Sequence, residues 1–258
     1  MKTSRDSFGP NANKYSQSAV HASLIDLEQF VSWSAPLKHE IALDVATGSG
    51  NVALALAPYL RHVVAYDLTS QMLDEVRKNA LNKEITGIEC ALGDAHSLPF
   101  ESNLFDIVTL RLAMHHFAKP RLALGEINRV LKPNGRFVFA DNFVPDDSTL
   151  DRQINEIETL RDPSHVRCNT LNELTTEFID LGFEIERTDQ GYLTGTEDGR
   201  MDFEEWMERI DTPYENRYLL REKFRNATPS LRDALKIIEV NGKIRFSLLR
   251  VTILARKK

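Results

Sequence analysis

Short apolar runs alternate with helical patterns along most of this chain. Four apolar runs occupy residues 41–45, 63–66, 107–110 and 137–140. Continuous runs of this kind are typical of strands that are buried on both faces of a parallel sheet. Apolar residues at helical spacing separate them, at residues 52–60, 70–82 and 121–131. The alternation predicts right-handed βαβ crossovers and an α/β fold with a doubly wound sheet.

Further elements are predicted on either side of this core. Leu24, Leu27 and Val31 recur at helical spacing between about residues 22 and 33, behind a polar arm without a core pattern. Thr170 and Glu173 form a capping box for a helix at 171–181, and Gly182 follows its last turn. We expect the two β-rich stretches that follow to form a hairpin at the sheet edge, at 183–187 and 245–255.

Composition disfavours several classes of function. The formal net charge of −6 argues against a protein that grips nucleic acid, because phosphate binding requires clustered Lys and Arg. No signal peptide and no apolar stretch of about 20 residues is present, so we expect no membrane partner and a cytoplasmic location. The two cysteines are Cys90 in a predicted strand and Cys168 in a polar loop. They allow neither a disulfide framework nor a paired-thiol zinc site, and no metal is expected.

The stretch from Asp44 to Ala53 is the most informative about a ligand site. A buried strand ends there, glycines turn the chain, and a helix begins. Gly48 and Gly50 let the backbone approach a ligand, while the helix N-terminus presents unpaired N–H groups. The spacing also matches the dinucleotide fingerprint, with Asp67 near the distance expected for a ribose-binding acid. A tight turn without a ligand is the alternative.

Three acidic residues at strand ends separate these interpretations. Asp44 precedes the glycines, where a carboxylate would repel a pyrophosphate but could hold the ammonium group of S-adenosylmethionine (SAM). Asp67 ends the second strand, where it could bind two ribose hydroxyls or cap the next helix. Asp94, in the segment 93–100, could accept the adenine amino group while apolar neighbours pack on the ring. An Asp-containing turn is the alternative for this last segment.

Together these segments resemble the successive motifs of class I SAM-dependent methyltransferases. Within that class the chain is most similar to the ubiquinone/menaquinone-biosynthesis C-methyltransferase-like group. The motifs that carry the resemblance are 44–50, Asp67, 93–100, 106–117 and 131–136. The resemblance implies a Rossmann-like, seven-stranded sheet with an antiparallel last strand, SAM as cofactor and S-adenosylhomocysteine as product. The chain departs from the group at Ala46, where many members carry glycine; a small residue should still clear the cofactor.

The resemblance also implies a cofactor site along the ends of the first four strands. The expected cofactor-binding residues are Asp44, Ala46, Thr47, Gly48, Gly50, Asp67, Leu68, Met72, Asp94, Ala95 and Arg111. Tyr15, in the N-terminal arm, is expected to contribute to a flap over the cofactor. A disordered tail is the alternative for this arm.

Methyl transfer from a sulfonium needs alignment, desolvation and, for weakly acidic nucleophiles, a base. The segment 111–117 should flank the methyl group in this fold, which makes His116 a candidate catalytic residue and His115 a candidate substrate contact. The segment lacks the Asn/Asp-Pro-Pro-Tyr signature of amino-methylating relatives. C- or O-methylation of a small molecule is therefore favoured, and a structural role is the alternative for either histidine.

A second polar cluster, at 160–167, lies in an insertion after the fifth strand. We expect His165, a second candidate catalytic residue, to share a pocket with His116 beside the cofactor, because both segments leave the carboxyl ends of strands. Arg161 or Arg167 would orient an anionic or carbonyl-bearing substrate, and the insertion would become ordered when ligand binds. The alternative is a solvated, charged loop.

The full length, 1–258, is expected to be a single domain, since α/β domains with insertions reach this size. The chain is divided into an N-terminal arm and helix (1–35), a SAM-binding half (36–145), two insertions expected to act as lids (146–169 and 195–242), and the rest of the sheet (170–194 and 243–258). A homodimer is compatible with the sequence.

Two other functions would use the same glycines. If the chain were an NAD-dependent oxidoreductase, Asp44 and the segment 93–100 would have no role in binding the cofactor. A SAM-binding protein that transfers no methyl group, such as a lyase, a pericyclase or a regulatory module, would bind SAM without forming S-adenosylhomocysteine.

Overall fold

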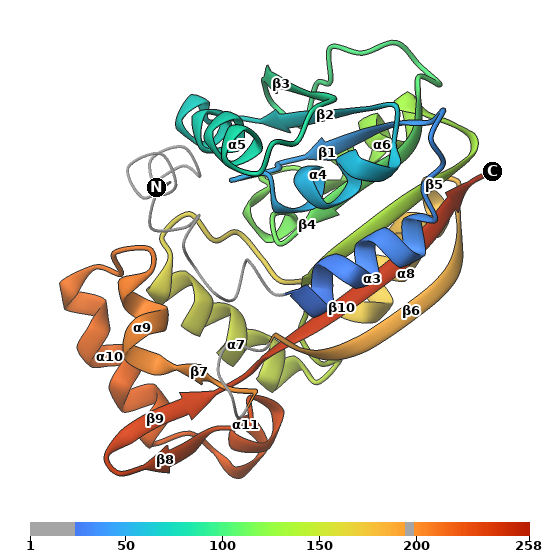
Figure 1. Cartoon of the computed structure of the whole chain (residues 1–258). Coiled ribbons are helices and arrows are strands. Elements are labelled where there is room, and N and C mark those ends of the chain that lie inside the picture. The colour runs from blue at the N-terminus through green and yellow to red at the C-terminus, as the bar shows by residue number, and fades with distance from the viewer. Residues whose placement is uncertain (1–23, 194–198) are drawn as a thin grey trace.

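A seven-stranded sheet organises the chain in a computed structural model, which describes residues 24–193 and 199–258 (Figure 1). The strand order is β3-β2-β1-β4-β5-β10-β6. The first five strands run parallel and span Ile41–Val45, His62–Asp67, Ile88–Leu92, Phe105–Arg111 and Leu131–Asn142. Strand β10 (Leu248–Lys257) runs antiparallel between β5 and β6 (Phe183–Leu193). The predicted sheet with an antiparallel last strand is confirmed.

Helices cover both faces of this sheet, because strand residues alternate between two hydrophobic clusters. One face packs against α3 (Leu24–Ser34), α4 (Asn51–Leu56) and α5 (Ser70–Asn82). The other packs against α6 (Pro120–Val130) and α8 (Leu171–Asp180) (Figure 1). In β1, Ala42 faces the first layer, whereas Leu43 and Val45 face the second, as the two-residue period of a strand requires. Burial on both faces accounts for the continuous apolar runs.

Local sequence signals set several helix boundaries. Helix α8 begins with the predicted capping box: the Thr170 hydroxyl accepts from the Glu173 N–H, and the Glu173 carboxylate accepts from the Thr170 N–H. The helix predicted at 52–60 is shorter than expected, because α4 ends at Leu56 and a 3-10 turn, Ala57–Tyr59, follows. Pro58 has no N–H group to continue the α-helical bonding.

Much of the two insertions folds into one structure with a hydrophobic cluster of its own, called here the insertion module. Its elements are α7 (Ser148–Arg161), β7 (Met201–Asp202), α9 (Phe203–Glu208), α10 (Tyr214–Arg225), α11 (Pro229–Ala234), β8 (Ile238–Val240) and β9 (Lys243–Phe246). Strands β7, β9 and β8 form a small second sheet. Four aromatic rings, of Phe203, Trp206, Phe224 and Phe246, meet at its centre with centroids 4.6 to 6.3 Å apart.

One expectation about this region is wrong. The strand predicted at 245–255 is split at Ser247, because Phe246 is fully buried among the aromatic rings of the module while β10 continues in the main sheet. The predicted pair of strands therefore exists as β6 and β10, but along the sequence most of the insertion module lies between these two strands. Cys168 lies in a loop, as expected, and its side chain is buried in the module's cluster, where its N–H donates to Asn155 Oδ1 at 2.7 Å.

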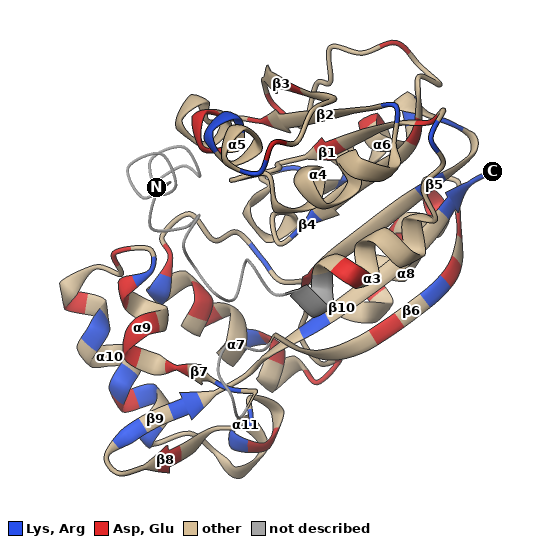
Figure 2. Cartoon of the chain, in the orientation of Figure 1, with Lys and Arg blue, Asp and Glu red and all other residues tan. Residues whose placement is uncertain are grey.

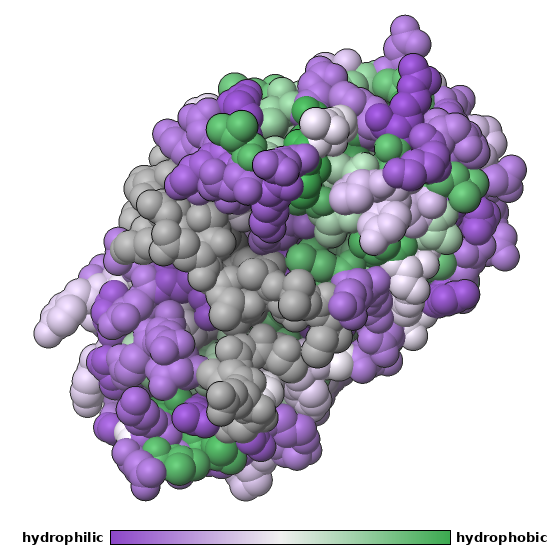
Figure 3. Space-filling view, viewed as in Figure 1, coloured by the Kyte–Doolittle hydropathy of each residue, from purple (hydrophilic) through white to green (hydrophobic). Residues whose placement is uncertain are grey.

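The visible face of the described residues is mostly polar. Basic and acidic residues are interspersed along the helices and strands (Figure 2). Hydrophilic residues cover most of the visible face outside the grey atoms, with small hydrophobic patches between them (Figure 3). Within residues 24–193 and 199–258, no helix combines the length and the apolar character that crossing a membrane requires.

Candidate active site

The glycine-rich turn lies at the carboxyl edge of the sheet, between β1 and α4. The Thr47 N–H donates to the Tyr66 carbonyl and the Gly50 N–H to the Thr47 carbonyl, each at 3.0 Å. Gly50 has a φ of +85°, and a Cβ there would lie 3.0 Å from the Val76 side chain. Glycine is therefore required for the close approach of α5. A Cβ on Gly48, whose φ is +55°, would meet no atom within 4 Å, so the space in front of this residue is open.

Asp44 ties this turn to the sheet. Its buried carboxylate accepts hydrogen bonds from Thr47 Oγ1 at 2.5 Å, from the Ala53 N–H at 3.2 Å and from Thr109 Oγ1 at 2.7 Å. Burial raises the pKa of Asp44 to about 6, although these hydrogen bonds and the charge of Arg111 oppose the rise. At neutral pH the turn therefore contains a buried negative charge that could pair with a cationic group of a ligand.

Asp67, at the end of β2, is the second carboxylate of the turn. Its Oδ2 accepts from the Gly48 N–H at 2.8 Å, and its Oδ1 accepts from the Thr69 N–H at 2.9 Å. Burial raises its pKa despite these backbone hydrogen bonds. The N-cap of α5 is Thr69, so the alternative role of Asp67 as a helix cap is wrong.

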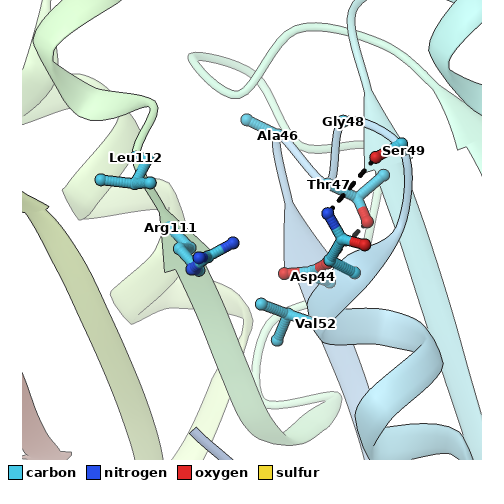
Figure 4. Close-up of a pocket in the computed structure, with 9 residues that line it drawn as sticks. Asp44, Ala46, Thr47, Gly48, Ser49, Val52, Arg111 and Leu112 are labelled. Carbon is cyan, nitrogen blue, oxygen red and sulfur yellow. Dashed lines mark hydrogen bonds between the residues drawn. The ribbon is translucent and has the colours of Figure 1, made fainter. Parts of the chain in front are cut away.

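A pocket lies between this turn and the end of β4 (Figure 4). The residues that line it are Asp44, Ala46, Thr47, Gly48, Ser49, Asn51, Val52, Arg111 and Leu112. Four of them, Ser49, Asn51, Val52 and Leu112, were not singled out from the sequence. The first three belong to the predicted strand-to-helix segment 44–53, and Leu112 belongs to the segment 111–117 expected to flank the methyl group, so their positions were a usable signal. Arg111 reaches from the opposite wall toward Asp44 and Val52 (Figure 4).

The remaining predicted cofactor residues occupy the next two loops along the same edge. Leu68 follows β2 directly, and Met72 is buried in the first turns of α5. After β3, the Asp94 carboxylate accepts from the His96 N–H at 2.9 Å, and Ala95 is buried in the main core. Gly50 supports the turn through its packing rather than lining the pocket. Tyr15 lies outside the described residues.

The loop after β3 is held against β2 by a close contact. The Tyr66 hydroxyl donates to the Asp94 carbonyl at 3.2 Å. A Cβ on Gly93 would lie 2.0 Å from that hydroxyl oxygen. Glycine is therefore required at this position for the loop to approach the strand end, which explains the Gly-Asp pair of the motif.

Three histidine rings meet beyond the pocket. His115 and His116 lie in the 3-10 turn Met114–His116 after β4, and His165 comes from the loop after α7. The ring centroids are 4.1 Å apart for His115 and His116, 5.7 Å for His115 and His165, and 6.4 Å for His116 and His165. The loop is pinned here because the N–H groups of Val166 and Arg167 both donate to the His115 carbonyl. The structure thus brings together the histidines that the sequence selected.

His115 is oriented by a carboxylate from the end of β5. Its Nδ1 lies 2.5 Å from Asp141 Oδ1, and its backbone N–H donates to Asp141 Oδ2 at 3.1 Å. Because an ionised carboxylate only accepts hydrogen bonds, Nδ1 carries the hydrogen. Burial lowers the pKa of His115, but the charge and the hydrogen bond of Asp141, aided by two further carboxylates, Glu158 and Asp162, leave it above its usual value.

The other two histidines are held neutral. His116 Nδ1 donates to the Ser164 carbonyl at 3.2 Å, and burial together with the charge of His115 lowers its pKa to about 3. His165 Nε2 lies 3.0 Å from Asn155 Oδ1, an oxygen that also accepts a backbone N–H. Nε2 therefore carries the hydrogen of His165, and Nδ1 is an acceptor. Burial, followed by the charges of His115 and His116, lowers the pKa of His165 to about 2.

His165 Nδ1 is buried and has no hydrogen-bond partner within the part of the chain that the structure describes. Buried polar atoms are almost always hydrogen-bonded, so an acceptor in this position indicates that a water or a ligand group completes the site. Over the described ranges, no cluster of three or more His, Cys, Asp or Glu side chains is arranged to hold a metal ion.

The two arginines expected to orient a substrate make contacts within the protein. The Arg167 guanidinium donates to Asp151 at 2.9 and 3.0 Å and to Glu173 at 3.0 and 3.1 Å. Arg161 is buried over the Trp206 ring, 4.8 Å from its centroid, and its Nε donates to the Trp206 carbonyl. These contacts anchor the insertion, and neither arginine lines the pocket of Figure 4.

Known proteins resemble this chain along most of its length. A model of the family described as "Methyltransferase domain" matches residues 43–139. The uncharacterized methyltransferase YcgJ of Bacillus subtilis (strain 168) is 31% identical over 258 residues, which cover 99% of this chain and 100% of YcgJ. The crystal structure of YcgJ superposes with a TM-score of 0.82 at 29% identity and covers 91% of this chain and 98% of that one.

Two further relatives extend the comparison. The crystal structure of a Bacillus halodurans C-125 protein superposes with a TM-score of 0.84 at 32% identity and covers 90% of this chain and 99% of that one. The ubiquinone/menaquinone biosynthesis C-methyltransferase UbiE of Ruegeria sp. (strain TM1040) is 35% identical over 114 residues, which are 43% of this chain and 46% of UbiE.

Proposed function

Because the chain belongs to the class I SAM-dependent methyltransferases, we propose that it methylates an oxygen or carbon atom of a small molecule. The membership rests on the match to YcgJ over nearly the whole chain. It favours methyl transfer over hydride transfer with NAD and over SAM binding without reaction. The acceptor atom and the size of the substrate are the parts that we infer from the site.

The groups around the glycine-rich turn fit SAM. We assign the buried carboxylate of Asp44 to the ammonium group of the cofactor and Asp67 to its ribose hydroxyls. Asp94 and Ala95 would receive the adenine. The open space in front of Gly48 supports this assignment, since a ligand can approach the backbone there. When bound, SAM supplies an electrophilic methyl group on a positively charged sulfur.

The observation that carries the choice of acceptor atom is the His115–Asp141 pair. Hydroxyl groups and carbon acids must lose a proton when they are methylated, so they benefit from a base. Asp141 holds Nδ1 of His115, which leaves Nε2 as the reactive nitrogen, and raises the pKa of the ring. His115 lies three residues beyond Leu112, which lines the pocket. We therefore assign the base to His115 rather than to His116 or His165.

His165 supports this site in a different way. With a pKa of about 2 its ring stays neutral, and its Nδ1 can accept a hydrogen bond but cannot hold a proton near neutral pH. Its ring centroid is 5.7 Å from that of His115. A substrate hydroxyl that donates to His165 Nδ1 would therefore lie beside the base.

Burial of the histidines supports a small substrate. His115 is 7% exposed and His165 is 3% exposed, and the loop that carries His165 is bonded to His115 through the N–H groups of Val166 and Arg167. A folded protein or a nucleic acid duplex could not reach these rings.

The proposed function is tested by incubating the protein with SAM and fractions of a small-molecule extract. S-adenosylhomocysteine and a product heavier by one CH2 group are expected, and NMR of that product identifies the methylated atom. The rate should rise with pH through the pKa of His115 and lose this dependence in His115→Gln. A methyl group on nitrogen, or on protein or nucleic acid, would refute the proposal.

A further inference from the structure

Leu112 combines a place in the pocket with an unusual backbone conformation. It follows the last residue of β4, and its φ is +52°. Bulky L-residues rarely adopt this left-handed region, because Cβ crowds the following carbonyl oxygen. A backbone hydrogen bond from the Leu112 N–H to the Ala140 carbonyl, at 2.8 Å, fixes the conformation.

The Leu112 side chain lies between two parts of the molecule. It lines the wall of the pocket that faces Ala46 and the glycine-rich turn (Figure 4). It also packs against the hydrophobic cluster of the insertion module. The left-handed turn thus places an aliphatic side chain where the pocket ends and the module begins.

The assigned carboxylates indicate which part of the cofactor this wall would meet. The sulfur of SAM carries three substituents: the ribose carbon, the methionine chain and the methyl group. In the assigned orientation, Asp67 binds the ribose near the end of β2, and Asp44 binds the methionine chain near the start of α4. The third substituent then faces the remaining wall, which is formed by Arg111 and Leu112 at the end of β4.

We propose that Leu112 is a specificity-determining residue, whose side chain closes the pocket toward the insertion module and limits the size of the group carried on the sulfur. The inference rests on the proposed function, because it assumes the assigned orientation of SAM. Its physical basis is steric: a wall that packs against a hydrophobic cluster on its far side cannot yield to a larger group without loss of contacts.

The test uses binding rather than turnover, so it needs no acceptor substrate. Calorimetry measures the dissociation constants of SAM and of its analogue with an allyl group in place of the methyl. We expect the wild type to prefer SAM by more than tenfold. In Leu112→Ala this preference should fall by about tenfold, since each methylene that a pocket must accommodate is worth about 10-fold or more in discrimination.

Two further variants complete the design. Leu112→Gly removes the same side chain and adopts a positive φ without strain, so it should shift the preference as Leu112→Ala does and melt at a higher temperature than Leu112→Ala. Leu122→Ala, at an exposed site on α6, is the matched control and should leave the preference unchanged. An unchanged preference in both Leu112 variants, with SAM binding intact, overturns this inference alone. A wild type that binds neither ligand overturns the proposed function as well.

Discussion

Replacing Asp44 by asparagine should separate cofactor binding from stability. The carboxylate is buried, accepts three hydrogen bonds and has a pKa of about 6. Asparagine has nearly the same shape but no charge. The substitution therefore removes a group that is costly to bury and that we assign to the ammonium group of SAM.

The expected effect on stability is a difference of two terms. A rise in pKa from 3.8 to about 6 corresponds to about 3 kcal/mol by which burial disfavours the ionised side chain at neutral pH. Against this, asparagine keeps an oxygen for Thr47 and Ala53 only if its amide nitrogen faces Thr109 Oγ1, which now donates to Asp44, and a lost hydrogen bond at a buried site costs about 1–3 kcal/mol. The free energy of unfolding of Asp44→Asn at pH 7 should therefore lie within about 2 kcal/mol of the wild-type value.

The same pKa sets the pH dependence. Between pH 3.8 and about 6 the native state binds a proton at Asp44 that the unfolded state does not, so this group favours folding more as the pH falls. The wild type should gain about 1.4 kcal/mol relative to the variant for each pH unit below 6. Urea unfolding of both proteins at pH 7 and pH 5 measures this difference.

Calorimetry measures the effect of Asp44→Asn on the dissociation constant of SAM. Loss of a hydrogen-bonded charge contact, worth about 1.5–3 kcal/mol, should weaken SAM binding by about 10- to 150-fold in Asp44→Asn. The reasoning is refuted if the variant binds SAM as the wild type does and is less stable by more than about 4 kcal/mol at pH 7. Asp44 would then be a structural cross-link between β1, β4 and α4 only.

Three other substitutions test separate parts of the structure. Asp67→Asn should weaken SAM binding by about 10- to 150-fold in calorimetry while changing the melting temperature little, and an unchanged dissociation constant removes Asp67 from the site. Ala46→Gly should raise the free energy of unfolding by about 0.5–1 kcal/mol, because Ala46 has a φ of +51° that glycine adopts freely; a fall would contradict the strain argument. His165→Phe should flatten the loss of stability below pH 6.5, since the unfolded state protonates this histidine and the native state does not. The wild type should lose about 1.4 kcal/mol more per pH unit, and equal slopes would show that His165 is not held neutral.

Local sequence patterns determined most of the main sheet and the glycine-rich turn. The apolar runs identified β1, β2, β4 and β5, because strands buried on both faces consist mostly of apolar residues in their central parts. The bounds of α5 at Ser70–Asn82 and the capping box of α8 also followed from neighbouring residues alone. Five of the predicted residues line the pocket, and each lies at or near the carboxyl end of a strand. Because parallel strands end at the same edge of the sheet, the sequence position of these residues also indicates their place in the structure.

Only the tertiary structure decided which side chains work together. Asp141 bonds to His115 from a position 26 residues further along the sequence, and Asn155 fixes the tautomer of His165. The hydrophobic periodicity of the sequence predicts neither contact. Packing in the insertion module also buried Cys168, split β9 from β10 and placed Leu112 in the pocket wall. Periodicity and turn signals depend on residues within a few positions of one another, whereas side-chain partners depend on strand register and on how separate elements pack together.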